Sequence, residues 1–307
     1  MDLLSKLLAE KEELARKLDE NAANIAELSG VDVGGSMIEC AHDAVQHIPP
    51  DSWLVNALIP SVGFGVIGAP PYAGKSFLAT HMAGSIASGR HIFGPFRANS
   101  PVPVLYIYYE SGRSEFLTTL KRSLESRGID GKNIFVNAGN IPNKRLRIGS
   151  SGFEAAIRAS GARFIVADTL SFASDGKDES NEEFQHKVVD PTVDLTKRLG
   201  VYILYVHHSQ KNTEGVDEVY SFRGGSTLSA GADTLVRVDK LKNEPRESKR
   251  RKFTIVKARG AHCGHVDLEF DFHRRVAYAV DEDPREVLFP PEKLAAMKSK
   301  DPWKGDR

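Results

Sequence analysis

Several features that would assign a protein class at once are scarce in this chain. It has two cysteines, Cys40 and Cys263, and they are too far apart to indicate a disulfide framework or a metal-binding spacing. No apolar run approaches the roughly 20 residues that cross a membrane as a helix, and no signal peptide is visible. We therefore expect a soluble protein of a reducing compartment, the cytoplasm.

Charge of one sign is also missing. Lys and Arg together number 41, and Asp and Glu together number 41, so the formal net charge is zero. No overall field draws the chain to nucleic acid or to a membrane, and any such binding must come from local patches. No internal repeat is visible, and 307 residues suit one large domain with short appendages.

The most informative stretch is residues 63–78, GFGVIGAPPYAGKSFL. An apolar run, a turn-prone loop and the start of a helix follow one another, and such a loop directs backbone N–H groups at phosphate. The pattern is that of a nucleotide-binding P-loop with Ala in place of the usual first Gly. The residues expected to bind nucleotide are Ala69, Pro70, Pro71, Tyr72, Ala73, Gly74, Lys75, Ser76 and Phe77.

Three P-loop residues have separate expected roles. Lys75 is expected to reach the β- and γ-phosphates, and the Ser76 hydroxyl to bind Mg²⁺. Gly74 leaves room for the backbone to approach the phosphates. The alternative is a chance match in a loop, and the strand and helix that flank the loop argue against it.

Apolar strands and amphipathic helices alternate through most of the chain, which predicts an α/β fold with a mainly parallel sheet. Strands are expected at 64–67, 102–109, 133–137, 164–167 and 201–206. Helices are expected at 77–88, 114–126, 153–160 and 182–199, with a kink at Pro191. Hairpin-like strands at 234–240, 251–259, 266–272 and 276–280 predict an antiparallel extension of the sheet.

The domain organisation expected from these patterns has four parts. Residues 1–29 form a coiled-coil-like helix, 30–43 a linker, 44–280 the nucleotide-binding domain and 281–307 a charged, mobile tail with little to bury. The apolar seam of the first helix suits pairing between subunits or with a helix of another protein. It suits packing against its own domain equally well.

Ligands of open α/β sheets bind beyond the carboxyl ends of the strands, so these ends supply further candidates. Glu110 ends one strand and can orient a water that attacks the γ-phosphate, or it is a solvated strand-end residue. Asp168 ends an apolar strand, the Walker B arrangement that holds Mg²⁺, or it caps the following helix. Of His207 and His208, only one can face the phosphates, because successive strand residues point to opposite faces.

With these residues identified, the chain resembles the RecA-like ATPases, and within them the RepA family of hexameric plasmid replicative helicases, relatives of DnaB. The resemblance covers about residues 60–260. It rests on the segments APPYAGKS, YIYYES, FIVADTLS, YVHHSQK, RGGSTLSAGADTLVRV and VKARGA. The first four segments indicate a RecA-like core. The histidines followed by RGGSTLSAGAD are what point to the RepA family within the RecA-like ATPases.

The resemblance implies a three-layer RecA-like core and a homo-oligomeric ring, a hexamer, with ATP and Mg²⁺ between subunits. One subunit would then supply Lys75, Ser76, Glu110, Asp168 and His208, the last matching the sensor position. The neighbouring subunit would supply Arg223 and, with less support, Lys257 and Arg259. The implied function is an ATP-driven motor on single-stranded DNA, a replicative helicase. Alternatives are a recombinase-like DNA-coating ATPase and a regulatory or scaffolding ATPase with no nucleic-acid role.

Three further segments bear on that choice. The two loops expected to line a DNA channel, 174–180 and 211–218, are acidic on balance, which weakens the helicase interpretation. A basic run from Lys240 to Lys252 can contact DNA or form a solvated hairpin tip. Residues 262–265, HCGH, lack a nearby fourth ligand, so we do not interpret them as a metal site.

Overall fold

The computed structural model describes residues 13, 41, 52–109, 112–137, 143–174, 184–209, 225–241, 244–245, 247–261 and 263–299. The chain separates into two units, Met1–Pro50 and Asp51–Arg307, and the account below concerns the second. The predicted N-terminal helix and linker lie outside the described residues, apart from Glu13 and Ala41. Glu110 and Arg223 lie outside them as well.

Within the described part of the chain, nine strands form one mixed sheet in the order β13-β12-β11-β10-β3-β9-β8-β6-β7. The strands from β10 to β7 pair in parallel, and β10 to β13 pair antiparallel. The predicted α/β fold and its antiparallel extension are therefore confirmed. The strand bounds are β3 Gly63–Ala69, β6 Val104–Tyr108, β7 Ile134–Val136, β8 Phe164–Asp168, β9 Tyr202–His208, β10 Thr234–Lys240, β11 Arg250–Ala258, β12 Gly264–Asp271 and β13 Val276–Ala279.

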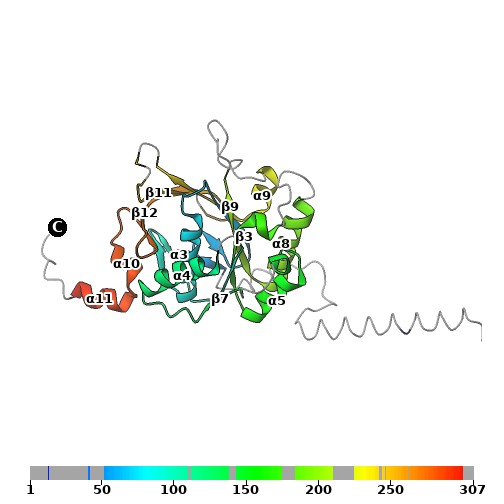
Figure 1. Cartoon of the computed structure of the whole chain (residues 1–307), viewed down its shortest axis with the longest axis horizontal. Helices are drawn as coiled ribbons and strands as arrows, with labels where there is room; N and C mark the ends of the chain where they lie inside the picture. The colour runs from blue at the N-terminus through cyan, green and yellow to red at the C-terminus, as the bar shows by residue number, and fades with distance from the viewer. Residues whose placement is uncertain are drawn as a thin grey trace, which may run out of the picture. The chain divides into compact units, whose positions relative to one another are not determined.

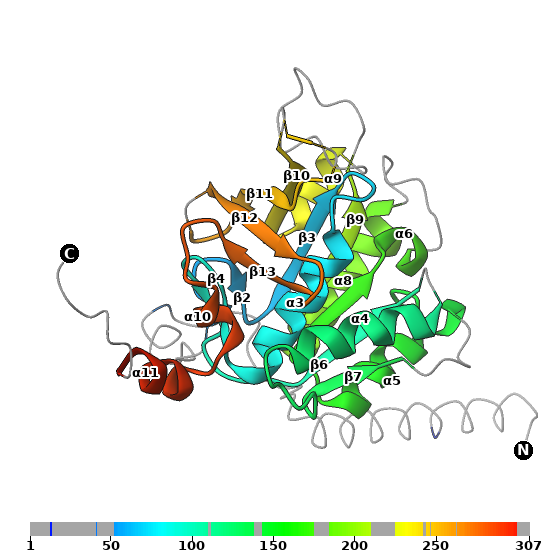
Figure 2. The same ribbon diagram turned by 60° about the vertical axis from the view of Figure 1, so that its left-hand side comes forward.

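Helices cover both faces of this sheet (Figures 1 and 2). One face packs on α3 (Lys75–Ser88) and α4 (Arg113–Glu125), and the other on α5 (Ser151–Ser160) and α8 (Asp190–Leu199). Burial on both faces explains why the central strands carry continuous apolar runs rather than alternate apolar positions, as β8 shows with four buried apolar residues before Asp168. The shorter helices are α6 Leu170–Ala173, α9 Gly225–Gly231, α10 Pro284–Leu288, α11 Pro291–Ser299 and the 3-10 turn η1 Asn143–Leu146.

The helix expected to kink at Pro191 changes type instead. A π-helical turn, η2, spans Gln185–Val189, and the regular helix α8 begins at Asp190 with the proline in its first turn. Proline has no backbone N–H to donate, and the first turn of an α-helix needs none. The irregularity therefore lies just before Pro191 rather than at it.

Four short strands add two small sheets that the sequence patterns did not indicate. They are β1 Trp53–Val55 with β2 Ile59–Pro60, and β4 His91–Phe93 with β5 Phe96–Arg97. None of the described helices is both long and apolar enough to pass through a membrane.

The segment after Asp281 differs from the expected tail with little to bury. It contains α10 and α11, and Val287 of α10 is buried. Just before α10, the Glu282 carboxylate accepts hydrogen bonds from the backbone N–H groups of Gly94 and Ala279 and contacts His91. Burial of these polar groups ties residues 281–288 to the β4–β5 region, a long-range contact that local composition does not reveal.

Candidate nucleotide site

The predicted P-loop lies between β3 and α3, where the motif requires it. Gly74 has a φ of 97°, which side-chain-bearing residues rarely adopt, and a Cβ at this position would lie 2.5 Å from Cε2 of Phe270. The Gly74 carbonyl accepts from the Leu78 N–H at 3.0 Å, so the helix starts immediately after the loop. Glycine is therefore the residue that suits this junction, because it accepts the positive φ and leaves room for the Phe270 ring.

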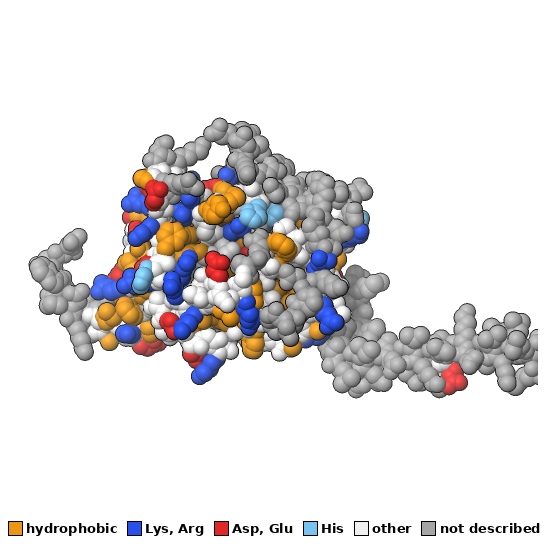
Figure 3. Space-filling view, in the orientation of Figure 1, with side chains coloured by type: hydrophobic (Ala, Val, Ile, Leu, Met, Phe, Trp, Pro, Cys, Tyr) orange, Lys and Arg blue, Asp and Glu red, His pale blue; other side chains and the backbone are white. Residues whose placement is uncertain are grey.

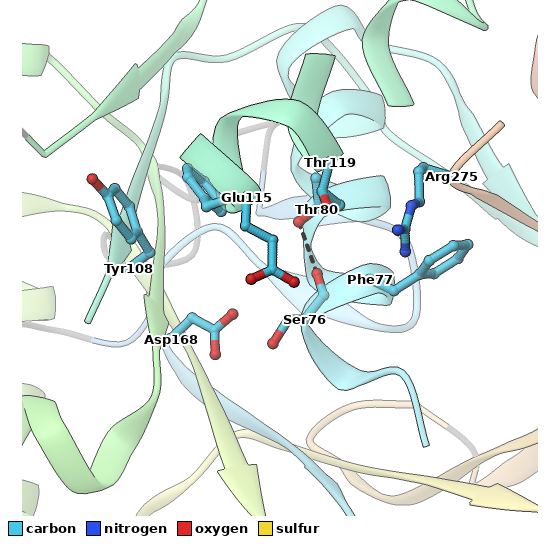
Figure 4. Close-up of a pocket in the computed structure, with 9 residues that line it drawn as sticks. Ser76, Phe77, Thr80, Tyr108, Glu115, Thr119, Asp168 and Arg275 are labelled. Atoms are coloured by element: carbon cyan, nitrogen blue, oxygen red, sulfur yellow. Dashed lines mark hydrogen bonds between the residues drawn. The ribbon is translucent and has the colours of Figure 1, made fainter. Parts of the chain in front are cut away.

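Beside the start of α3 lies a pocket with a volume of about 250 Å³. Its lining is mixed, with hydroxyl, carboxylate, guanidinium and aromatic groups: Ser76, Phe77, Thr80, Tyr108, Glu115, Phe116, Thr119, Asp168 and Arg275. Figure 4 shows the side chains of Ser76, Glu115 and Asp168 directed toward one space. The predicted residues Ser76, Phe77 and Asp168 are thus brought together, although they come from separate parts of the chain.

Asp168 ends β8 with its side chain in this pocket, while Thr169 takes the N-cap position of α6. The buried Tyr106 of β6 donates its hydroxyl to Oδ2 of Asp168 at 2.8 Å. Burial, and next the charge of Asp168, raise the pKa of Tyr106 well above its usual value, so the hydroxyl keeps its proton and remains a donor. Tyr106 therefore orients the carboxylate that faces Ser76.

This donor set fits a divalent cation with its nucleotide. The Ser76 hydroxyl and the Asp168 carboxylate are the hard oxygen ligands that Mg²⁺ prefers, and both line the pocket. The carboxylate is nearly buried and held by Tyr106, so it is oriented before any ligand arrives. These two residues are the ones that would hold the metal.

The histidine pair at the end of β9 separates as strand geometry predicts. Val206 belongs to the core on the α3 face and Tyr205 to the core on the opposite face, so alternation places His208 on the α3 face and His207 on the other. His208 also pairs in register with Ala69, the first P-loop residue, and it is half-buried where His207 is buried. This placement agrees with the choice of His208 for the sensor position, a role that remains a prediction.

The two residues assigned with less support to a neighbouring subunit's site have partners within their own chain. The Lys257 ammonium donates to the carbonyls of Ser229 (2.6 Å) and Ala230 (3.2 Å) at the end of α9. The Arg259 guanidinium donates to the Ala230 carbonyl at 3.2 Å and lies 3.4 Å from Asp233. Cations at a helix C-terminus stabilise the last carbonyls, so both residues support α9 here. Their action across an interface remains a prediction.

The sequence did not identify Arg251, an arginine that contacts the backbone of the P-loop. Arg251 of β11 is buried, and its Nε donates to the Ala73 carbonyl at 2.9 Å. Its guanidinium lies 5.4 Å from the ring centre of Phe270, which stacks on Phe77 at 4.5 Å. For Arg251 the solvated-tip interpretation of the basic run is therefore wrong. Along β11, Arg251 shares the alternation of the buried Phe253 and Ile255, and that period of two was the available signal.

Glu115 and Arg275 are the other pocket residues that the sequence did not identify. Glu115 lies in the first turn of α4, five residues after Glu110, and brings a second described carboxylate to the pocket. Arg275 comes from the turn between β12 and β13. Nothing local distinguishes it from its neighbour Arg274, because only the tertiary fold shows which one faces the pocket.

A P-loop between β3 and α3, an aspartate at the end of β8 and a parallel sheet with an antiparallel extension define a P-loop ATPase with a RecA-like fold. The chain belongs to the AAA domain family, whose model matches residues 38–214, more than half of its length. No curated protein sequence matches the chain.

Solved structures with the same fold include two with low sequence identity. A DnaB-like replicative helicase, described together with its interactions with primase, aligns over 91% of this chain and 77% of its own, with 14% identity and a TM-score of 0.55. The RadB recombinase aligns over 73% of this chain and 93% of its own, with 14% identity and a TM-score of 0.51. At these identities the comparison establishes the fold.

Proposed function

We propose that this protein is a Mg²⁺-dependent ATPase that works as an oligomer on single-stranded DNA, in the manner of the RepA-like replicative helicases. The observation that carries the ATPase part is the juxtaposition of the P-loop helix with Asp168 in one pocket. A hydroxyl and an oriented carboxylate at a helix N-terminus are the groups that phosphoryl transfer to water requires.

In this proposal, each residue of the site has a separate role in binding or hydrolysing ATP. The N-terminus of α3, which begins just after Gly74, and Lys75 bind and orient the phosphates. Tyr106 holds Asp168, and Asp168 with Ser76 would hold the metal, which when bound would supply positive charge beside the phosphates. Glu110 is the residue we propose to orient the attacking water. Tyr109, the last described residue before it, donates its backbone N–H to the Asp168 carbonyl at 2.8 Å.

The oligomeric part of the proposal rests on the resemblance to ring-forming ATPases. In such an assembly, Arg223 would reach the nucleotide of the neighbouring subunit and stabilise the charge of the transition state. Hydrolysis would then depend on assembly. The coiled-coil pattern of residues 1–29 offers a second contact between subunits.

Action on DNA rests on the structural relatives, which by their names are a replicative helicase and a recombinase. The charge distribution offers less support. On the described part of the face in Figure 3, basic and acidic side chains are interspersed, and no continuous basic stripe is visible there. The zero net charge is the observation that favours the second candidate, a regulatory ATPase without a nucleic-acid role.

The test is steady-state ATP hydrolysis by the full chain, with and without single-stranded DNA, at low and moderate salt. Strong stimulation that weakens with salt supports a DNA motor or a recombinase-like protein. Hydrolysis that is unchanged by DNA supports the regulatory ATPase. Lys75→Ala is the control for the site itself, and normal hydrolysis by this variant would overturn the whole assignment.

If DNA stimulates hydrolysis, a second measurement separates the two DNA-binding candidates. A replicative helicase should form closed rings and unwind a forked duplex with a fluorescent strand. A recombinase-like protein should form filaments on single-stranded DNA, visible by electron microscopy, with no strand release.

A further inference from the structure

The turn between β12 and β13 is held rigidly by its own polar groups. Oδ1 of Asp271 accepts the backbone N–H groups of His273 (3.0 Å) and Arg274 (2.8 Å), and its carbonyl accepts that of Arg275 at 2.7 Å. The Arg274 guanidinium pairs with Oδ2 of the same aspartate at 2.9 Å. One arginine of the turn is therefore already paired on its outer side.

The same turn is fastened to both helices that flank the pocket. Ser126, just after α4, donates its hydroxyl to the Arg274 carbonyl at 2.9 Å. The backbone N–H of Ala277 lies 3.4 Å from Nδ1 of His81, which is buried within α3. These contacts fix the backbone on either side of Arg275 relative to the P-loop helix.

Arg275 itself points inward and lines the pocket together with Ser76 and Asp168, as Figure 4 shows. Its Nε is shielded from solvent and has no hydrogen-bond acceptor among the described residues. A buried donor without an acceptor is costly, which indicates a ligand that the arginine meets when the site is filled. The φ of 57° at Arg275 belongs to the hairpin loop that the Asp271 carbonyl closes, and it fixes where the side chain leaves the backbone.

The position in the pocket indicates the kind of ligand. Ser76 and Asp168 mark the metal-binding end of a P-loop site, where the terminal phosphates lie. A guanidinium is the side chain best shaped to bind phosphate oxygens with two parallel hydrogen bonds. Because this arginine comes from the same chain as the P-loop, it needs no neighbouring subunit to act.

We propose that Arg275 is a phosphate-contacting residue supplied by the same chain, and that it recognises the terminal phosphate of a bound nucleoside triphosphate. The proposal rests on the nucleotide site proposed above. It assigns to the C-terminal hairpin, which lies beyond residue 214 where the family match ends, a role in distinguishing the triphosphate from the diphosphate.

The test is a titration of the full chain with a fluorescent, non-hydrolysable ATP analogue and with the corresponding ADP derivative, both with Mg²⁺. Arg275→Ala should weaken binding of the analogue by about tenfold or more and change ADP binding by less than about twofold. Arg275→Lys, which keeps the charge but not the fork, should lie between. His273→Ala is the control from the same turn: it removes an exposed side chain and keeps the backbone hydrogen bond to Asp271, so this variant should bind both nucleotides as the unmodified protein does.

Two outcomes would overturn the proposal: unchanged binding of both nucleotides by Arg275→Ala, or an equal loss for both. A further contradicting result would come from a double variant with Glu115, which faces the same pocket. If Arg275→Ala no longer affects the analogue in a Glu115→Gln background, the arginine acts by neutralising that carboxylate rather than by touching phosphate. Should the alanine variant fold poorly by circular dichroism, Arg275→Gln and Arg275→Lys decide in its place.

Failure of the proposed function has a different signature. Lys75→Ala should lose both nucleotides, because Lys75 and the P-loop bind phosphates common to each. If Lys75→Ala binds both as before, the nucleotide site is wrong whatever Arg275 does. If only the Arg275 variants behave as the unmodified protein, the site stands and the role of Arg275 falls.

Discussion

Arg251 donates its Nε to the carbonyl oxygen of Ala73 at 2.9 Å, across 178 residues of sequence. The contact joins the outer, antiparallel half of the sheet to the loop that we propose binds phosphate. It gives the Ala73 carbonyl, which lies in the loop, a charged donor. The conformation of the P-loop thus depends on β11 as well as on the strand and helix that flank it.

Replacing this arginine should loosen the P-loop. We expect Arg251→Ala to lower the free energy of unfolding by about 1–3 kcal/mol, because the Ala73 carbonyl loses a charged donor. Nucleotide affinity should fall as well, measured by fluorescence titration. The neighbouring Arg250→Ala is the control, since Arg250 is exposed and lies 3.6 Å from Glu244. Equal effects from the two substitutions would show that the contact with Ala73 does not contribute specifically to stability or to nucleotide affinity.

Tyr106 should matter through Asp168 rather than by touching nucleotide. Tyr106→Phe removes one hydroxyl, and we expect about a tenfold rise in the Mg²⁺ concentration needed for half-maximal nucleotide binding, because the carboxylate loses its orienting donor. Tyr205→Phe is a matched control: it is also buried, but its hydroxyl bonds Thr192 on the opposite face of the sheet. A Mg²⁺ dependence that both variants share with the unmodified protein would contradict the role of Tyr106.

The buried His81 should make the folded protein less stable in mild acid. Nε2 of His81 bonds the Ile92 carbonyl at 2.9 Å and Nδ1 faces the Ala277 N–H, so the folded ring is neutral. Burial, and next the charge of Arg127, hold the pKa of His81 well below its usual value. Below about pH 6.5 the unfolded chain therefore binds a proton that the folded chain does not, and unfolding becomes easier.

When the pH falls from 7 to 5.5, the imidazole of His81 alone should lower the free energy of unfolding by about 1 kcal/mol. Urea denaturation at a series of pH values measures the slope. His81→Gln keeps a polar side chain without a titrating ring, so its slope should be smaller by that amount. Equal slopes for the two proteins would show that His81 takes up its proton in the folded state.

Mixed oligomers test the arginine proposed to act across an interface. Arg223→Ala and Lys75→Ala subunits should each be nearly inactive alone, and mixing them should restore some hydrolysis, because some interfaces then regain both groups. Subunit exchange is verified separately with two fluorescent labels. Verified exchange with no recovery would place Arg223 within its own subunit's site, or outside the site altogether.

The sequence predicted the parts of the site that depend on local order. The P-loop is contiguous, and the spacing of its glycine, lysine and serine is enough to predict a role for each. Asp168 was predictable because an apolar strand that ends in a carboxylate is a local pattern, and parallel strands end at the same edge. The parallel direction of the central strands followed from the alternation of strands and helices.

The supporting residues were not predictable in the same way. Arg251 and Arg275 reach the site through antiparallel pairing and a tight turn, and no local pattern states which strand lies beside which loop. The basic run around Arg251 suggested solvent exposure by composition, whereas alternation with Phe253 and Ile255 indicated burial. Where composition and periodicity disagreed, periodicity was correct, because it reports the face on which a residue lies.

The distance along the chain between Ala73 and Arg251 also determines the order in which the parts of the site can fold during translation. A ribosome that has translated the P-loop must add well over a hundred further residues before the arginine that steadies it exists, and Arg275 follows later still. Domains form as their segments emerge, so a nascent chain can assemble the parallel strands first. Tight nucleotide binding would then arise late in synthesis, when the last hairpin pairs with the sheet.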